Sequence, residues 1–131
     1  MKYLLTLWGD EARWADRTPE EIQAAMKEWD AYTVETQDAG AFLGGEGLQP
    51  TATATTVAIQ TDGNQIVTDG PFAETKETLG GFYLLECKDL DEAIAWARKI
   101  PMPGGKVEVR PVMDYEAAGS GAHANAAEAR R

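Results

Sequence analysis

The sequence predicts an α+β domain in which an antiparallel sheet carries two helices on one face, and three observations lead to this prediction. Two segments, residues 18–39 and 89–100, have the capping signals and apolar periodicity of helices. Short apolar or alternating runs around them have the pattern of strands. The resulting order (strand, helix, strand hairpin, strand, helix, strand) is that of a ferredoxin-like sandwich, and 131 residues suit one domain of this kind.

The first helix has the clearest start and stop signals. It follows a short apolar run, residues 3–8, which predicts a buried strand. Thr18 can cap the helix, Pro19 suits its first position and Glu21 completes a capping box. Gly40 is expected to end it as the left-handed residue beyond the last turn. The predicted buried face consists of Ile22, Ala25, Met26, Trp29, Tyr32 and Thr33.

The second half of the chain supplies the other strands and a second helix. Residues 53–59 have the period-two pattern of a strand, and residues 65–68 return as its partner across an Asp-Gly-Asn turn. Residues 80–87 form the most apolar strand of the chain. Asp89 then caps the second helix, and residues 106–110 alternate as a last strand.

The segment 41–50 is too glycine-rich for a regular interior strand. Its run Gly44-Gly45-Glu46-Gly47 is not followed by the Lys-Ser/Thr of a phosphate-binding loop. We therefore interpret the run as a bulge or a close backbone approach, with Glu46 as a candidate to face a cavity.

Composition excludes several classes of function. A formal net charge of −10 disfavours binding to nucleic acid or to an anionic membrane surface. The single Cys87 excludes an internal disulfide and a cysteine zinc site, and the single His123 leaves no histidine metal site in the domain. No apolar stretch is long enough to span a bilayer, and the first residues lack the features of a signal peptide. We expect a cytoplasmic protein with neither cofactor nor metal.

The chain is predicted to divide into a domain, residues 1–115, and a small-residue tail, residues 116–131, that is mobile or weakly helical. The predicted strands 3–8 and 82–87 are apolar on both faces, whereas two helices can cover only one face of a sheet. A second copy of the chain would cover the other face, so we expect a two-fold homodimer.

Several ordered motifs surround the sequence Asp69-Gly70-Pro71-Phe72. They are Gly45-Glu46-Gly47-Leu48-Gln49-Pro50, Ala52-Thr53-Ala54-Thr55, Thr68-Asp69-Gly70-Pro71-Phe72-Ala73-Glu74-Thr75-Lys76-Glu77, Gly80-Gly81-Phe82-Tyr83-Leu84 and Glu108-Val109-Arg110-Pro111-Val112. Together they resemble the YCII-related family, in its DGPF-motif branch, over nearly everything from Met1 to Met113. The resemblance implies a dimeric α+β barrel built from ferredoxin-like subunits.

The resemblance also implies a range of functions. The family is mostly uncharacterised, and similar proteins are often encoded beside extracytoplasmic-function sigma factors. Related members act on small chlorinated aromatic or lactone substrates, and a His–Asp pair is proposed as their catalytic site. The aspartate of that pair corresponds to Asp69 here. Trp29 stands where the family's histidine is expected on the first helix.

The candidate site residues each have two interpretations. Asp69 is either a turn former or a general acid or base at a pocket mouth. Trp8 and Trp29 are either core or interface residues, or they line an apolar pocket for an aromatic ligand. Lys76 is either part of a solvated turn or a contact for an anionic group. Phe72 completes the ligand-binding candidates.

Three functions follow from these candidates. The first is a protein that binds a small apolar or aromatic molecule without catalysis, in a regulatory role. The second is a cofactor-free enzyme, an isomerase or lyase acting on a small aromatic or lactone, with Asp69 as its acid or base. The third is an interaction module associated with a sigma factor. The missing histidine and nucleotide motifs favour the first of these.

Overall fold

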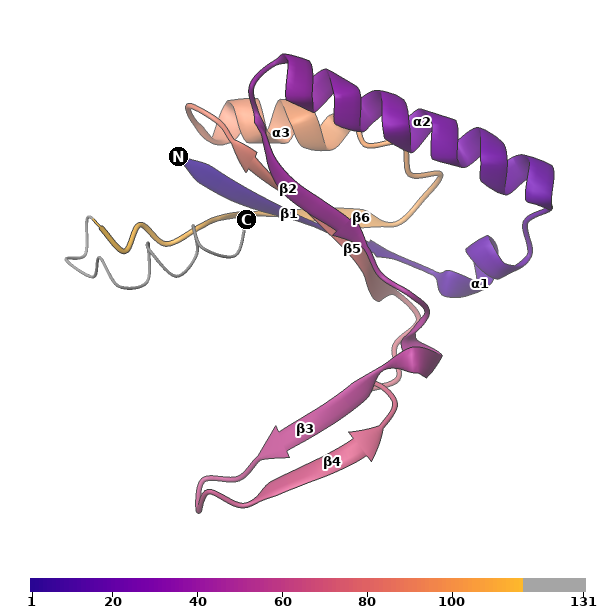
Figure 1. Ribbon diagram of the computed structural model, residues 1–131, viewed down its shortest axis with the longest axis vertical. Helices are drawn as coiled ribbons and strands as arrows, with labels where there is room; N and C mark the ends of the chain where they lie inside the picture. The colour runs from indigo at the N-terminus through magenta and orange to yellow at the C-terminus, as the bar shows by residue number, and fades with distance from the viewer. Residues whose placement is uncertain (117–131) are drawn as a thin grey trace.

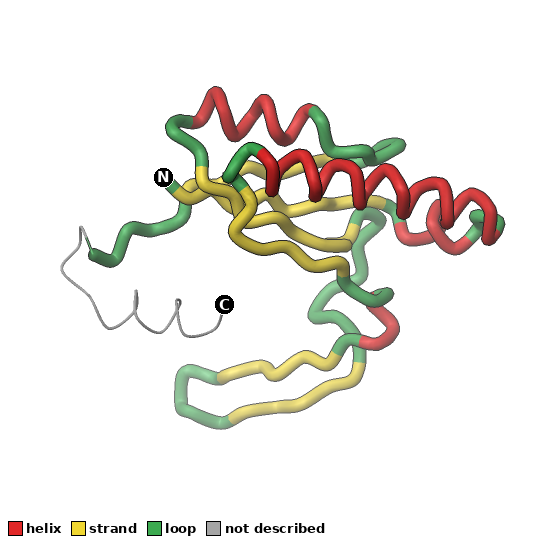
Figure 2. Tube along the Cα trace, turned by 45° about the horizontal axis from the view of Figure 1, so that its top comes forward, coloured by secondary structure: helices red, strands yellow, loops and turns green. Residues whose placement is uncertain are grey.

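The computed structural model describes residues 1–116. Their elements are β1 (Lys2–Gly9), α1 (Glu11–Ala15), α2 (Pro19–Asp38), β2 (Phe42–Gly47), the 3₁₀ turn η1 (Thr51–Thr53), β3 (Thr55–Ile59), β4 (Gln65–Asp69), β5 (Thr78–Glu86), α3 (Leu90–Arg98) and β6 (Lys106–Pro111). Four antiparallel strands form a sheet in the order β2-β5-β1-β6, and α2 and α3 lie on one face of it (Figures 1 and 2). The predicted α+β class is confirmed. The predicted tail, beyond its first residue, lies outside the described residues.

Local capping chemistry sets the helix ends as the sequence predicted. The Thr18 hydroxyl accepts the backbone N–H of Glu21 at 3.2 Å, and the Glu21 carboxylate accepts the backbone N–H of Thr18 at 3.4 Å. Gly40, beyond the end of α2, has a φ of 73°, which glycine adopts without strain. At the start of α3, Asp89 accepts the backbone N–H of Glu92 at 2.9 Å.

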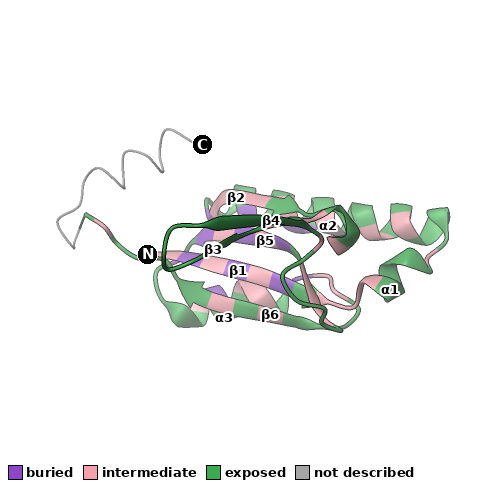
Figure 3. Ribbon diagram, turned by 90° about the horizontal axis from the view of Figure 1, so that it is seen from below, coloured by how far each residue is buried: buried purple, intermediate pink, exposed green. Residues whose placement is uncertain are grey.

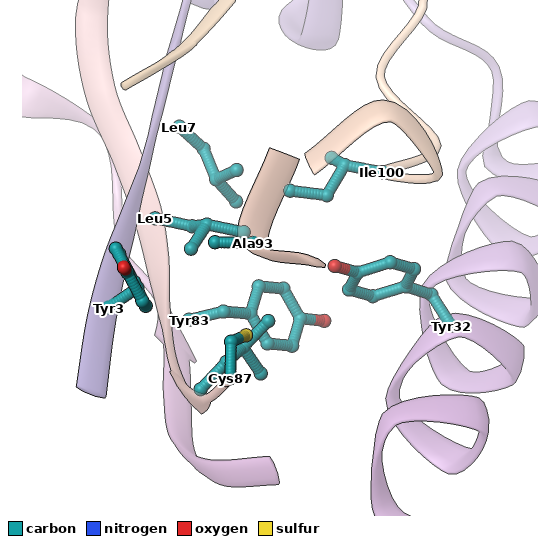
Figure 4. Packing of buried hydrophobic residues seen from close by; sticks show 9 residues of the cluster. Tyr3, Leu5, Leu7, Tyr32, Tyr83, Cys87, Ala93 and Ile100 are labelled. Carbon is teal, nitrogen blue, oxygen red and sulfur yellow. The ribbon is translucent and has the colours of Figure 1, made fainter. Parts of the chain in front are cut away.

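The core lies between the sheet and the two long helices (Figure 4). Its buried members are Tyr3, Leu5, Leu7, Tyr32, Tyr83, Leu85, Cys87, Ala93 and Ile100. Alternate residues of β1 and β5 therefore point toward the helices, and we call this side of the sheet the inner face. Cys87 is buried there. Burial, with the nearby carboxylates of Glu92 and Glu86, raises the pKa of its thiol to about 11.

The buried face of α2 differs from the prediction. Tyr32 and Thr36 are buried, whereas Met26 is 48% exposed and the other predicted members are half-buried. The reason is length: α2 has 20 residues and spans about 30 Å, and Figure 1 shows its N-terminal half extending past the end of the sheet. Only its C-terminal half packs against the strands.

The strand assignment also needs a correction. The predicted hairpin of residues 53–68 is not part of the main sheet; β3 and β4 form a separate two-stranded ribbon, which we call the arm. The place in the sheet is taken by β2, in the segment judged too glycine-rich for a regular strand. Glycines are tolerated there because β2 is an edge strand that supplies few packing side chains.

The other side of the sheet, the outer face, has no covering element within residues 1–116. Its centre carries the partly exposed apolar side chains of Leu4, Phe82 and Leu84. Figure 1 shows the arm standing away from the sheet on this side, and Figure 3 shows it in front of the outer face. Among the described residues of a single chain, a large apolar area on the sheet and the arm is thus left without cover.

Candidate functional site

A cleft of about 1050 Å³ lies at the end of the sheet where α2 extends past the strands. Its floor is formed by the ends of β1 and β2 and the start of β5. Its walls come from α1, the middle of α2 between residues 26 and 33, the loop 101–105, and residues 48–50 and 76–77 of the two segments that join the arm to the sheet. The cleft exists because α2 is longer than the strands beneath it.

Three glycines leave part of the floor of the cleft without side chains, beside the inward-facing Leu7. Gly81 pairs with Leu7 on one side and with Gly47 on the other, and Gly45 pairs with the inward-facing Tyr83. Directly paired residues share a face of an antiparallel sheet, so Gly45, Gly47 and Gly81 occupy inner-face positions. A Cβ on Gly81 would lie 2.8 Å from the carbonyl oxygen of residue 46, whereas a Cβ on Gly47 would meet only open space.

Aromatic side chains form one wall of the cleft. The rings of Trp29 and Tyr83 lie nearly parallel, at 10°, with their centroids 6.3 Å apart, and Phe42 meets Tyr83 edge-on at the same distance. The hydroxyl groups of Tyr83 and Thr33 are 2.8 Å apart and hydrogen-bonded. The wall therefore presents flat apolar surfaces with one polar pair among them.

The connection between α1 and the root of the arm is fixed by one carboxylate. Glu11 accepts the backbone N–H of Thr51 at 2.7 Å and its hydroxyl at 2.9 Å. Both bonds end on a charged acceptor, which makes them stronger than bonds between neutral groups. Glu11 thus ties the chain that leaves β2 to the rim of the cleft.

Two of the six predicted site residues have their side chains available to the cleft, and a third contributes differently. Trp29 and Lys76 both line it. Glu46 also lines it, but Glu46 pairs with the outer-face residue Phe82, so its side chain leaves from the outer face and its backbone forms the rim.

The other three predicted residues lie away from the cleft. Asp69 is the exposed last residue of β4, opposite Thr55 in the arm, and Phe72 follows it with 91% of its surface exposed. Trp8 lies beside a shallower hollow near β6, and its indole N–H donates to the Thr6 hydroxyl at 2.9 Å. Asp69 and Trp29 therefore do not form a site within one chain.

The sequence did not predict two features of the cleft: its glycine floor and the hydrogen-bonded hydroxyl groups of Thr33 and Tyr83. The glycines of residues 44–47 and 80–81 were visible, but they signal a side-chain-free floor only once their strands are known to be neighbours. Tyr83 and Thr33 are 50 residues apart in the sequence, and no local signal joins them.

Features that other classes of site require are absent from the part of the chain that the structure describes. No group of three His, Cys, Asp or Glu side chains in residues 1–116 is placed to hold a metal ion. Among the same residues no helix has the length and apolar character needed to cross a membrane.

Comparison with known proteins places the chain in a family. It matches the YCII-related domain over residues 1–116. It is also 38% identical, over 119 residues, to the uncharacterized protein R00369 of Rhizobium meliloti (strain 1021), an alignment covering 88% of this chain and 95% of that protein.

Proposed function

The chain belongs to the YCII-related family, and we propose that it binds a small molecule with an aromatic or apolar ring in the cleft beneath α2. The observation that carries this proposal is the combination of a side-chain-free glycine floor with the wall of Trp29 and Tyr83. Ligand sites are typically concave, mostly apolar and furnished with a few polar groups, and this cleft has that character.

The cleft suits a flat ring. Such a ring lies on the glycine floor and against Trp29, because offset stacking of aromatic rings is favourable. The hydrogen-bonded hydroxyls of Thr33 and Tyr83 offer a donor or acceptor that fixes its orientation.

The geometry supports binding better than proton transfer by Asp69. A general acid or base must come within hydrogen-bond reach of its substrate, and Asp69 lies on the exposed arm rather than in the cleft. Trp29, which stands in place of the family's histidine, contributes stacking area but no group that titrates.

A homodimer completes the proposal. The outer face has an apolar centre and a polar margin that includes the ion pair of Arg110 and Glu108 at 2.8 Å, the arrangement of a protein interface. A second copy is the occupant that covers this face and meets the arm, since a two-fold axis pairs the same surfaces on both chains. We expect at least about 2,000 Å² to be buried.

A matched pair of glycine variants tests the binding proposal. Gly47→Val places a side chain in the cleft, whereas Gly44→Val places one on the outer face of the same strand; a Cβ meets nothing within 4 Å at either position. With 1-naphthalenemethanol as the probe and calorimetry as the assay, we expect Gly47→Val to lose binding and Gly44→Val to keep it. Light scattering on both variants separates an effect on the cleft from one on assembly.

Equal affinity of the wild type and both variants would place the probe elsewhere. Absence of binding by the wild type to this probe and to its acid analogue 1-naphthoate would refute the proposal.

A further inference from the structure

The rim of the cleft carries cationic side chains that have no carboxylate partner. Arg13, Arg17 and Lys76 all line the cleft, and none forms an ion pair within residues 1–116. The Arg17 guanidinium lies over the Trp14 ring, 5.2 Å from its centroid. The Arg13 guanidinium packs on the backbone of Gly104, where an added Cβ would lie 2.5 Å from Nη1. Both arginines are therefore held at the rim by contacts other than ion pairs within residues 1–116.

The carboxylates that line the same cleft are mostly engaged elsewhere. Asp10 caps α1, accepting a backbone N–H at 3.0 Å, and Glu11 holds the η1 turn through two hydrogen bonds. Glu77 is ion-paired with a lysine of β6, and the Glu46 side chain leaves from the outer face. Asp30, exposed on α2, is the remaining carboxylate of the lining.

The lining of the cleft contains three cationic side chains and five carboxylates, in a chain whose net charge is −10. Glu77 is ion-paired and the Glu46 side chain leaves from the outer face, so the remaining carboxylates equal the cations in number. The three cations are distinguished by having no ion pair within residues 1–116. Apolar walls strengthen the field of such charges by excluding water. Arginine in particular matches the planar geometry of a carboxylate and can bind it through two parallel hydrogen bonds.

We infer that the ligand of this cleft is an aromatic or other apolar carboxylic acid, bound as its anion. The ring lies on the glycine floor against Trp29, and the carboxylate meets the cationic rim of Arg13, Arg17 and Lys76. This inference rests on the proposed function and adds the charge of the ligand to it. A cleft of about 1050 Å³ has room for a ring system with one acidic substituent.

Two probes of similar size separate charge from shape. 1-Naphthoate and 1-naphthalenemethanol share a ring system, but only the first is anionic at pH 7. The affinity of each is measured by calorimetry, in low salt and in 0.5 M NaCl, on the wild type, Arg13→Gln and Lys76→Gln. Lys27→Gln is the control, because Lys27 is an exposed lysine of α2 that forms no ion pair within residues 1–116 and does not line the cleft. Unchanged binding of the alcohol shows that a variant is folded.

We expect naphthoate to bind at least about tenfold more tightly than the alcohol in low salt, since hydrogen bonds to charged groups contribute about that factor or more. The preference should shrink in Arg13→Gln and Lys76→Gln, persist in Lys27→Gln and weaken with salt. Equal affinity for both probes in the wild type would overturn the inference and leave the proposed function standing. An equal loss in Lys27→Gln would also overturn it, because bulk charge would then explain the preference. Binding of neither probe would overturn both.

Discussion

The arm offers the sharpest test of the proposed dimer, because its two faces differ. Val57 pairs with Val67, and Ile59 follows Val57 on the same face by the alternation of a strand. These three side chains are 50%, 66% and 73% exposed, respectively. The opposite face carries the smaller pair of Ala58 and Ile66. We predict that the face with Val57, Val67 and Ile59 packs against the partner chain and that Val67→Asp therefore disrupts the dimer.

The size of the effect follows from exposure and symmetry. Full burial of a valine side chain is worth about 1.5–3 kcal/mol, so the exposed two-thirds of Val67 can contribute about 1–2 kcal/mol. A two-fold interface uses each residue twice, which doubles the loss to about 2–4 kcal/mol per dimer. The dissociation constant should rise about 30- to 1,000-fold, before any cost of desolvating the new carboxylates.

Sedimentation velocity over a range of concentrations measures this change. Ile66→Asp is the matched control: it adds the same charge one residue away, at a position 54% exposed, on the opposite face of the arm. We expect Val67→Asp to be monomeric where the wild type and Ile66→Asp are dimers, with far-UV circular dichroism showing that both variants are folded. A wild type that is monomeric at micromolar concentration would refute the proposed dimer. Equal dissociation constants of the two variants would refute the assignment of the face with Val57, Val67 and Ile59 to the interface.

Two further predictions concern the rim of the cleft and the core. Glu11→Ala should lower the free energy of unfolding by about 1–2 kcal/mol in urea denaturation, because it removes both hydrogen bonds to Thr51 at a partly exposed site. Thr51→Val should lower it by less, because the backbone N–H of residue 51 still donates to Glu11. Equal stability of the wild type and both variants would contradict this prediction. Burial raises the pKa of Cys87 from 9.0 to about 11, so iodoacetamide at pH 8 should label it slowly in the folded protein and rapidly in urea. Because the pKa of the thiol is higher in the folded than in the unfolded protein, the neutral thiol makes its full contribution to the free energy of unfolding below pH 9, and this contribution is lost as the pH rises toward 11. Rapid labelling of the folded protein would contradict this prediction, as would a free energy of unfolding that stays constant from pH 8 to 11.

The parts of the fold that the sequence predicted correctly are those that local chemistry decides. The capping box of Thr18 and Glu21, the left-handed Gly40 and the cap at Asp89 each depend on residues within a few positions of one another. Periodicity, which is also a local property, placed β1, α2, β5, α3 and β6 in their order, whereas the short α1 and the sheet strand β2 were not predicted. Trp29 and Lys76 line the cleft, and their predicted part in ligand binding stays a prediction.

The errors concern choices made between distant segments. The arm has the alternating pattern typical of a strand, whereas β2 is rich in glycine. The segment with the stronger strand pattern, the arm, was therefore assigned to the sheet. The sheet accepts the glycine-rich β2 because Gly81 of β5 lets its backbone approach closely, a fit that only the pairing reveals. Asp69 was predicted at a pocket mouth for the same reason, whereas it belongs to the arm and lies away from the cleft. The buried face of α2 was misplaced because no local pattern states how far a helix extends past its sheet.

The cleft and the proposed interface share one stretch of chain, which predicts that they are energetically linked. The chain leaves the cleft floor at Gly47, forms the arm and returns at Thr78, and both connecting segments line the cleft. A partner chain that packs against the arm therefore restrains part of the ligand site. Such coupling is reciprocal: if dimerisation strengthens ligand binding, the ligand strengthens dimerisation. We expect the monomeric Val67→Asp to bind 1-naphthoate about fivefold or more weakly than each site of the wild-type dimer. Saturating naphthoate should then tighten the wild-type dimer by the square of that factor, about 25-fold or more, because each dimer binds two ligands. Identical affinities of the folded monomer and the dimer would instead mean that a single chain holds the complete site.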